Sequence, residues 1–125
     1  MTGEDDLLAP FDPAIIDRVA GSHDVTADEL RDLLARHQAQ ARANPGVEDL
    51  VYEWRSQFHG QPLVHRTDDT YYLQLRGHVW DEFADALDLP EVALLALLAV
   101  HEEQTRADTG ATPGEDERMM VLSRE

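Results

Sequence analysis

The sequence predicts a mainly helical α+β domain in which about five helices pack with one two-stranded antiparallel β-hairpin. Apolar residues recur at helical spacing over most of the chain, whereas residues 63–75 alternate with a period of two. The chain has 125 residues and no cysteine, a length at which one hydrophobic core forms without disulfides or thiolate metal sites.

The expected organisation is a single globular domain over residues 11–106. We expect residues 1–10 to form a flexible acidic leader and residues 107–125 a flexible tail, because both are polar and the tail holds two turn signals. The leader lacks the basic start and apolar run of a secretory signal, and the longest apolar run, 92–100, has half of a membrane span's length. We therefore expect a cytoplasmic protein with no membrane association.

Two helix starts carry capping signals. Asp12 can cap a first short helix that has Pro13 at its first position and ends near Gly21. The segment Thr26-Ala27-Asp28-Glu29 is a capping box, and it opens a second helix that runs to about Ala43.

Three further helices are expected over residues 47–59, from about residue 78 to 88, and over 90–106. Pro90 suits the first position of the last helix. That helix is apolar on all sides between residues 92 and 100, so it lies either at the centre of the fold or in a homodimer interface.

The predicted hairpin joins strands at residues 63–66 and 71–75 through a polar turn at 67–70. A four-residue turn places Val64 opposite Leu73. A lone hairpin is unstable in water, so one of its faces must pack on the helices.

The charge balance is extreme. Twenty-six acidic residues oppose ten basic ones, all arginine, for a net charge of −16. Such a chain repels itself in dilute buffer, whereas molar salt shortens the Debye length to about 3 Å and screens the repulsion. We therefore expect a protein adapted to a highly saline cytoplasm; the alternative, a disordered acidic chain, conflicts with the strong apolar periodicity.

The acidic residues are unevenly distributed. Residues 1–30 carry a net charge of −7 and residues 77–125 carry −9, whereas residues 31–76 hold six acids and six arginines and are neutral. Two interpretations remain open: the neutral segment is buried, or it forms a surface that meets a partner.

No metal, cofactor or catalytic motif is predicted. The spacing of His59 and His65 fits no common metal motif, and the zincin-like start at His101-Glu102 lacks its second histidine. His37 lies on an apolar helix stripe, where a packing role is usual. The chain also lacks a nucleophile elbow and a phosphate-binding glycine loop, so an enzyme on a small polar substrate ranks third among the functions.

The leading hypothesis is a non-enzymatic interaction or regulatory protein that binds a protein partner through the neutral segment 31–76. The residues expected to line the partner surface are Tyr52, Arg55, His59, His65, Arg66 and Tyr72.

The second hypothesis is a DNA-binding regulator, because the order of helices and hairpin over residues 27–76 resembles a winged helix. The third helix would then enter the groove with Arg55, while Arg66 would contact phosphates. Glu53 on the same helix counts against this, as does the loss of counterion-release energy in molar salt.

Three segments, at residues 50–55, 66–73 and 79–83, resemble small uncharacterised haloarchaeal proteins known as a domain of unknown function. The resemblance covers roughly residues 11–106. It implies a compact protein of a saline cytoplasm and no particular activity, and it transfers no site residue.

Overall fold

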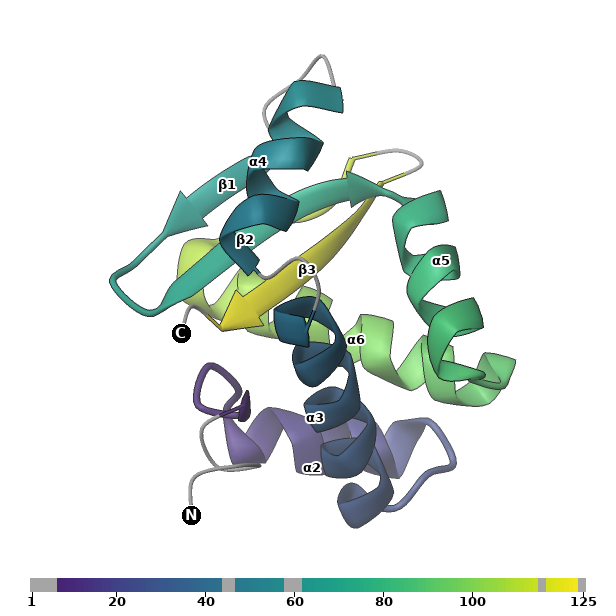
Figure 1. The fold of residues 1–125 in the computed structure, drawn as a ribbon. Helices are drawn as coiled ribbons and strands as arrows, with labels where there is room; N and C mark the ends of the chain where they lie inside the picture. The colour runs from purple at the N-terminus through teal and green to yellow at the C-terminus, as the bar shows by residue number, and fades with distance from the viewer. Residues whose placement is uncertain (1–6, 44–46, 58–61, 115–116, 124–125) are drawn as a thin grey trace.

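The computed structural model describes residues 7–43, 47–57, 62–114 and 117–123, which form five helices and one three-stranded antiparallel sheet. The α+β class with five helices is confirmed. In chain order the elements are α2 (Pro13–Ser22), α3 (Ala27–Ala43), α4 (Val47–Gln57), β1 (Leu63–Arg66), β2 (Thr70–Arg76), α5 (Gly77–Leu87), α6 (Glu91–Thr109) and β3 (Glu117–Ser123) (Figure 1).

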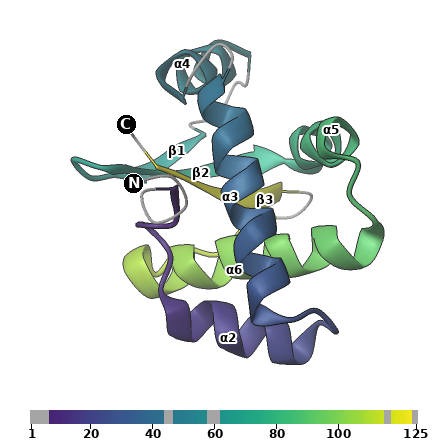
Figure 2. The same cartoon turned by 60° about the horizontal axis from the view of Figure 1, so that its bottom comes forward.

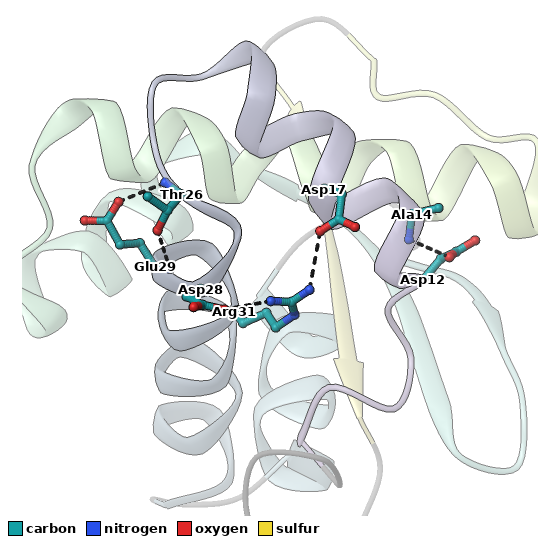
Figure 3. A network of polar contacts seen from close by, with 7 residues as sticks. All are labelled: Asp12, Ala14, Asp17, Thr26, Asp28, Glu29 and Arg31. Atoms are coloured by element: carbon teal, nitrogen blue, oxygen red, sulfur yellow. Dashed lines mark hydrogen bonds and ion pairs between the residues drawn. The ribbon is translucent and has the colours of Figure 1, made fainter.

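Both predicted helix caps are present. The Thr26 hydroxyl accepts the amide of Glu29 at 3.0 Å, and the Glu29 carboxylate accepts the amide of Thr26 at 2.8 Å (Figure 3). This reciprocal pair satisfies two amides that the first turn of α3 cannot satisfy itself. Asp12 caps α2 by accepting the amide of Ala14 at 2.9 Å.

The sheet corrects the expectation of a two-stranded hairpin. Its order is β1-β2-β3, so β2 is the central strand and β3 pairs with it from Thr70 opposite Ser123 to Arg76 opposite Glu117. Residues 117–123 belong to the expected flexible tail, and that expectation was wrong for them. Residues 119–123 are buried, so they lack the alternation of polar and apolar residues by which a half-exposed strand is recognised.

The register of the hairpin contains a β-bulge. Leu63 lies opposite Leu73, and His65 lies opposite Tyr72, with a register shift between Leu63 and His65. Val64 was predicted to lie opposite Leu73, and this was wrong because the extra residue of the bulge shifts the start of β1 by one position.

The sheet lies between α4 and α6, with α2 beyond α6 and α3 crossing the layers (Figure 2). Tyr72 points toward α6, because its hydroxyl bonds Asp108 of that helix. Side chains alternate along a strand, so Tyr71, Leu73 and Leu75 point to the α4 side, where all three are buried.

The outer edge of β3 is occupied by a glutamine side chain. The Gln38 side-chain amide donates to the carbonyl of Val121 at 2.7 Å and accepts the amide of Ser123 at 2.8 Å. Gln38 therefore supplies the donor and acceptor that a neighbouring strand would provide, from its buried position on α3.

Two ring side chains also form hydrogen bonds with the backbone at this edge of β3. The indole of Trp80 on α5 donates to the carbonyl of Met119 at 3.2 Å, and Nδ1 of His101 on α6 accepts the amide of Val121 at 2.9 Å. Three helices thus hold β3 through side chains, which satisfies backbone groups that would otherwise be buried without partners.

α6 is the central helix and contacts β3, α2 and α3. The sequence left two positions open for this apolar helix, the centre of the fold or a homodimer interface. The structure places it at the centre of the fold. Val92 and Leu95, in its first half, are 46% and 43% exposed. Among the helices that the structure describes, none combines the length and apolar character needed to cross a bilayer.

Candidate functional site

The residues predicted to form a partner surface are only partly brought together. Tyr52 and Arg55 are exposed on α4, Tyr52 by 75%, and His65 and Arg66 are exposed on β1. His59 lies outside the described residues.

Tyr72 does not belong to an exposed surface, although it was predicted to. It is 5% exposed, and its hydroxyl donates to Oδ2 of Asp108 at 2.6 Å. Burial, together with the hydrogen bond to Asp108, raises the pKa of the Tyr72 phenol well above its ordinary value. Asp108 also accepts the side-chain amide of Gln104 at 3.0 Å, so Tyr72 is part of an internal network that links β2 to α6.

The strand register divides the remaining residues between two sides of the sheet. Arg66 lies opposite Tyr71, so its side chain projects on the α4 side. His65 lies opposite Tyr72 and therefore projects on the α6 side, where its ring centroid is 5.8 Å from that of Tyr72. The exposed residues Tyr52, Arg55 and Arg66 are called the α4–β1 surface below.

The arginines of the described residues divide into those with and those without a carboxylate partner. Within the described part of the chain, neither the Arg55 nor the Arg66 side chain forms an ion pair or hydrogen bond. Three arginines elsewhere form ion pairs with carboxylates: Arg18 with Glu103, Arg31 with Asp17 and Asp28 (Figure 3), and Arg118 with Glu102. Arg76 and Arg106 are exposed as well and form no ion pair within the described residues, so at least four exposed arginines there are without a carboxylate partner.

The tip of the β1–β2 hairpin is acidic. Asp69 accepts the hydroxyls of Thr67 at 2.9 Å and Thr70 at 3.1 Å, and these bonds lower the pKa of its carboxyl group. Asp68 beside it is exposed as well. The side chains of Asp68 and Asp69 place two carboxyl groups where a winged helix would approach phosphates, which counts against the winged-helix alternative.

A buried cluster of rings lies between α3, α5 and α6. His37 stacks on Trp80 with centroids 4.6 Å apart and meets Phe83 edge-on at 4.5 Å. His101 lies edge-on to Trp80 at 4.8 Å and to Phe11 at 5.1 Å. The packing role expected for His37 agrees with this position, whereas no feature of the sequence singled out His101 as its neighbour.

The hydrogen bonds of this cluster decide which ring nitrogens carry protons. Because the amide of Val121 donates to Nδ1 of His101, the single proton of the neutral ring must be on Nε2. Nε2 of His101 is therefore a buried N–H donor that can serve neither as a metal ligand nor as a base. Nδ1 of His37 lies 3.4 Å from the side-chain nitrogen of Gln38, which favours the same tautomer.

Burial of both histidines opposes a positive charge on either ring. Burial lowers the pKa of His37 to about 3, and burial together with the nearby His37 lowers the pKa of His101 well below its usual range. Neither Nε2 atom has a hydrogen-bond partner among the described residues. No group of three or more potential ligands in the described ranges is arranged to hold a metal ion.

These features define a class of protein: an α+β domain with a helix-covered three-stranded sheet, a buried histidine–aromatic cluster and an exposed corner that carries Tyr52, Arg55 and Arg66. The chain belongs to the family Domain of unknown function (DUF8048), whose family model matches residues 9–124. The match confirms an uncharacterised family and extends through β3. No curated protein and no solved structure matches the chain.

Proposed function

We propose that this protein is a non-enzymatic interaction protein of a saline cytoplasm that binds a protein partner through the α4–β1 surface. One observation carries the proposal: a tyrosine that is 75% exposed, Tyr52, lies three residues from Arg55, which forms no ion pair within the described residues. Residues three apart are neighbours on a helix surface, so the two side chains are presented together.

Tyrosine and arginine suit this role because they carry a large part of the binding energy in protein interfaces. A carboxylate on the partner can accept a bidentate hydrogen bond from the Arg55 or Arg66 guanidinium.

The inner face of α4 supports this presentation. Val51 and Trp54 are 4% and 6% exposed and anchor the helix in the core. They fix the helix rotation, so Tyr52 and Arg55 face outward in the free protein. A preformed contact residue costs less conformational entropy on binding than one that must be ordered first.

The test is affinity capture in molar salt from cells that make the protein, followed by direct binding measurements with the recovered partner. Tyr52→Ala and Arg55→Glu should each weaken binding at least tenfold. The matched control is Arg106→Glu, which reverses an exposed arginine on α6 and should leave binding unchanged. Equal binding by all four proteins would refute the proposed surface.

DNA binding is the second candidate, since exposed arginines without ion pairs also suit phosphate contacts. The acidic hairpin tip at Asp68 and Asp69 favours the protein partner over DNA. Nuclease treatment before capture separates the two: recovery that survives nuclease and depends on Arg55 supports a protein partner, whereas recovery lost with the nucleic acid supports the DNA regulator.

A further inference from the structure

The central helix α6 is covered on one side and open on the other. Its buried residues face α2, α3 and β3, the elements that it contacts. Val92 and Leu95 lie on the open side, where they are 46% and 43% exposed, and the half-buried Ala99 lies one turn beyond Leu95. The residues Val92, Leu95 and Ala99 are called the α6 stripe below.

The spacing of the open side is that of a helix that packs lengthwise on another helix. Intervals of three, four, three and four residues separate Val92, Leu95, Ala99, Glu102 and Arg106. This alternation keeps successive residues on one seam of a helix pair. None of the five is buried, so the described part of the protein leaves this seam open.

Ion pairs compensate the carboxylates that border the C-terminal end of the α6 stripe. Glu103 pairs with Arg18 of α2 on one flank of the helix, and Glu102 pairs with Arg118 of β3 on the other. Both arginines stay accessible, with side chains 61% and 43% exposed. A second chain can therefore approach this end without meeting uncompensated negative charge.

The open side carries opposite charges at its two ends. Asp88 and Glu91, at the N-terminal end, are exposed and form no ion pair among the described residues. The C-terminal end holds Arg106, which is exposed and equally unpaired there, between Arg18 and Arg118. Two copies in antiparallel orientation bring each acidic end against a basic end, whereas a parallel pair brings acid against acid.

We propose that a second copy of this chain packs on the α6 stripe in antiparallel orientation, giving a two-fold symmetric dimer. The axis passes between Leu95 and Ala99, so Leu95 of each protomer lies opposite Ala99 of the other, and a large side chain meets a small one. Asp88 of each protomer approaches Arg106 of the other. Each of these contacts occurs twice, as a two-fold interface requires.

Self-complementarity is the reason for choosing a second copy over an unrelated helix. Asp88 precedes Leu95 by seven residues and Arg106 follows Ala99 by seven, so opposite charges lie at equal sequence distances from the centre of the stripe. An unrelated helix would need the same apolar spacing and the reversed order of charges. A copy of the chain rotated about the axis supplies both.

The flank of α6 beside β3 fits the same arrangement. Glu91 lies about three turns before Glu102 on this flank of the helix. The two-fold rotation brings Glu91 of one protomer to the Glu102–Arg118 ion pair of the other, where the five donors of the Arg118 guanidinium can serve a second carboxylate. Like charges at this flank are therefore bridged by an arginine.

The dimer does not depend on the protein partner proposed above. The sheet separates α6 from α4 (Figure 2), and the α6 stripe shares no residue with the α4–β1 surface. Either proposal can therefore fail without the other. In molar salt the charges are screened, so the apolar contact supplies the affinity and the charges set the orientation.

The first test is sedimentation equilibrium in molar KCl on the wild type, Leu95→Glu and Val64→Glu. Leu95→Glu places a charge at the centre of the interface. Val64→Glu is the matched control, since Val64 is 38% exposed and lies on β1. We expect a dimer for the wild type and for Val64→Glu, and an at least tenfold weaker dimer for Leu95→Glu. Circular dichroism checks that each variant is folded.

A wild type that stays monomeric at millimolar concentration would overturn the proposal, as would a dimer that Leu95→Glu leaves unchanged. Cysteine cross-linking tests the orientation, because the chain has no cysteine of its own. Chains with Leu95→Cys mixed with chains with Ala99→Cys should form a covalent dimer. Chains with Val92→Cys alone should not, since the antiparallel register separates the two copies of this position by about 15 Å along the helix. Cross-linking of Val92→Cys chains with one another would show a parallel pair, and the proposed dimer would be wrong.

Discussion

The imidazole rings of His37 and His101 meet almost at a right angle, with their centroids 5.1 Å apart and an interplanar angle of 85°. Both rings are fully buried among aromatic side chains, and each is the other's nearest titratable neighbour in the contacts described. A proton added to either ring would have no counter-ion and would lie beside a second basic ring. The cluster is therefore stable only while both rings are neutral.

The first prediction is acid destabilisation. Burial holds the folded pKa of His37 at about 3 against an ordinary value of 6.5, so the unfolded chain binds more protons between these values. The stability that this histidine contributes is complete above pH 6.5 and is lost as the pH falls toward 3. The expected slope is up to about 1.4 kcal/mol per pH unit for each such histidine. Chemical unfolding between pH 7 and about 5, where most carboxylates stay ionised, measures it.

Two variants make this prediction specific. His37→Leu replaces the buried ring with an apolar side chain of similar volume, so it should reduce the pH dependence by the contribution of His37 and leave that of His101, while retaining the fold. His65→Leu changes an exposed histidine and should keep the slope of the wild type. The explanation fails if His37→Leu loses stability with acid as steeply as the wild type does.

The second prediction concerns the edge of β3. Gln38→Ala leaves the carbonyl of Val121 and the amide of Ser123 buried without partners, which should lower the free energy of unfolding by about 2–4 kcal/mol. Denaturant titration in molar KCl measures the loss. The control is Gln40→Ala, two residues along the same helix at an exposed position, which should change stability by less than about 0.5 kcal/mol. Equal effects of the two variants would contradict the strand-like role of Gln38.

The third prediction separates structure from recognition at Tyr72. Tyr72→Phe removes the hydrogen bond to Asp108 and should cost about 1.5–3 kcal/mol, the usual range for a bond to a charged group. Because Tyr72 is buried, the same variant should leave partner capture unchanged. If a fully folded Tyr72→Phe variant captured less partner, Tyr72 would take part in binding and the prediction would be wrong.

The fourth prediction concerns salt. Dilution from molar salt to about 0.1 M lengthens the Debye length to about 10 Å, so the excess carboxylates repel one another over longer distances. The melting temperature should therefore fall. Exposed ion pairs such as Arg31 with Asp28 strengthen on dilution, yet each contributes at most about 1 kcal/mol, too little to reverse the trend. A melting temperature that rises on dilution would refute adaptation to high salt.

Local signals in the sequence were sufficient for the helices. The capping box at Thr26 and Glu29, and the proline at residue 13, act within one turn, so their effect can be read without knowledge of the tertiary fold. The hairpin was predicted for the same reason, since its strands are adjacent in sequence. The pairing predicted at the bulge was wrong, because one inserted residue does not visibly change the sequence pattern of a four-residue strand.

The strand β3 and the internal role of Tyr72 depend on distant contacts. β3 pairs with a strand that is separated from it by two helices, and burial removes its alternating pattern. The alternating pattern assigns Tyr72 to one face of the hairpin. Whether that face is exposed or buried depends on α6, which covers it in the folded protein. The pairing of His37 with His101 likewise joins two helices, so the spacing of histidines in the sequence could not reveal it.

The position of β3 in the chain has a consequence for biosynthesis. Gln38, Trp80 and His101 leave the ribosome well before the backbone groups that they bond, and five consecutive buried residues, 119–123, are made after all five helices. A nascent chain that stops before residue 117 keeps the edge of β2 and these three side chains without their partners. Products interrupted before residue 117 should thus remain open to proteases.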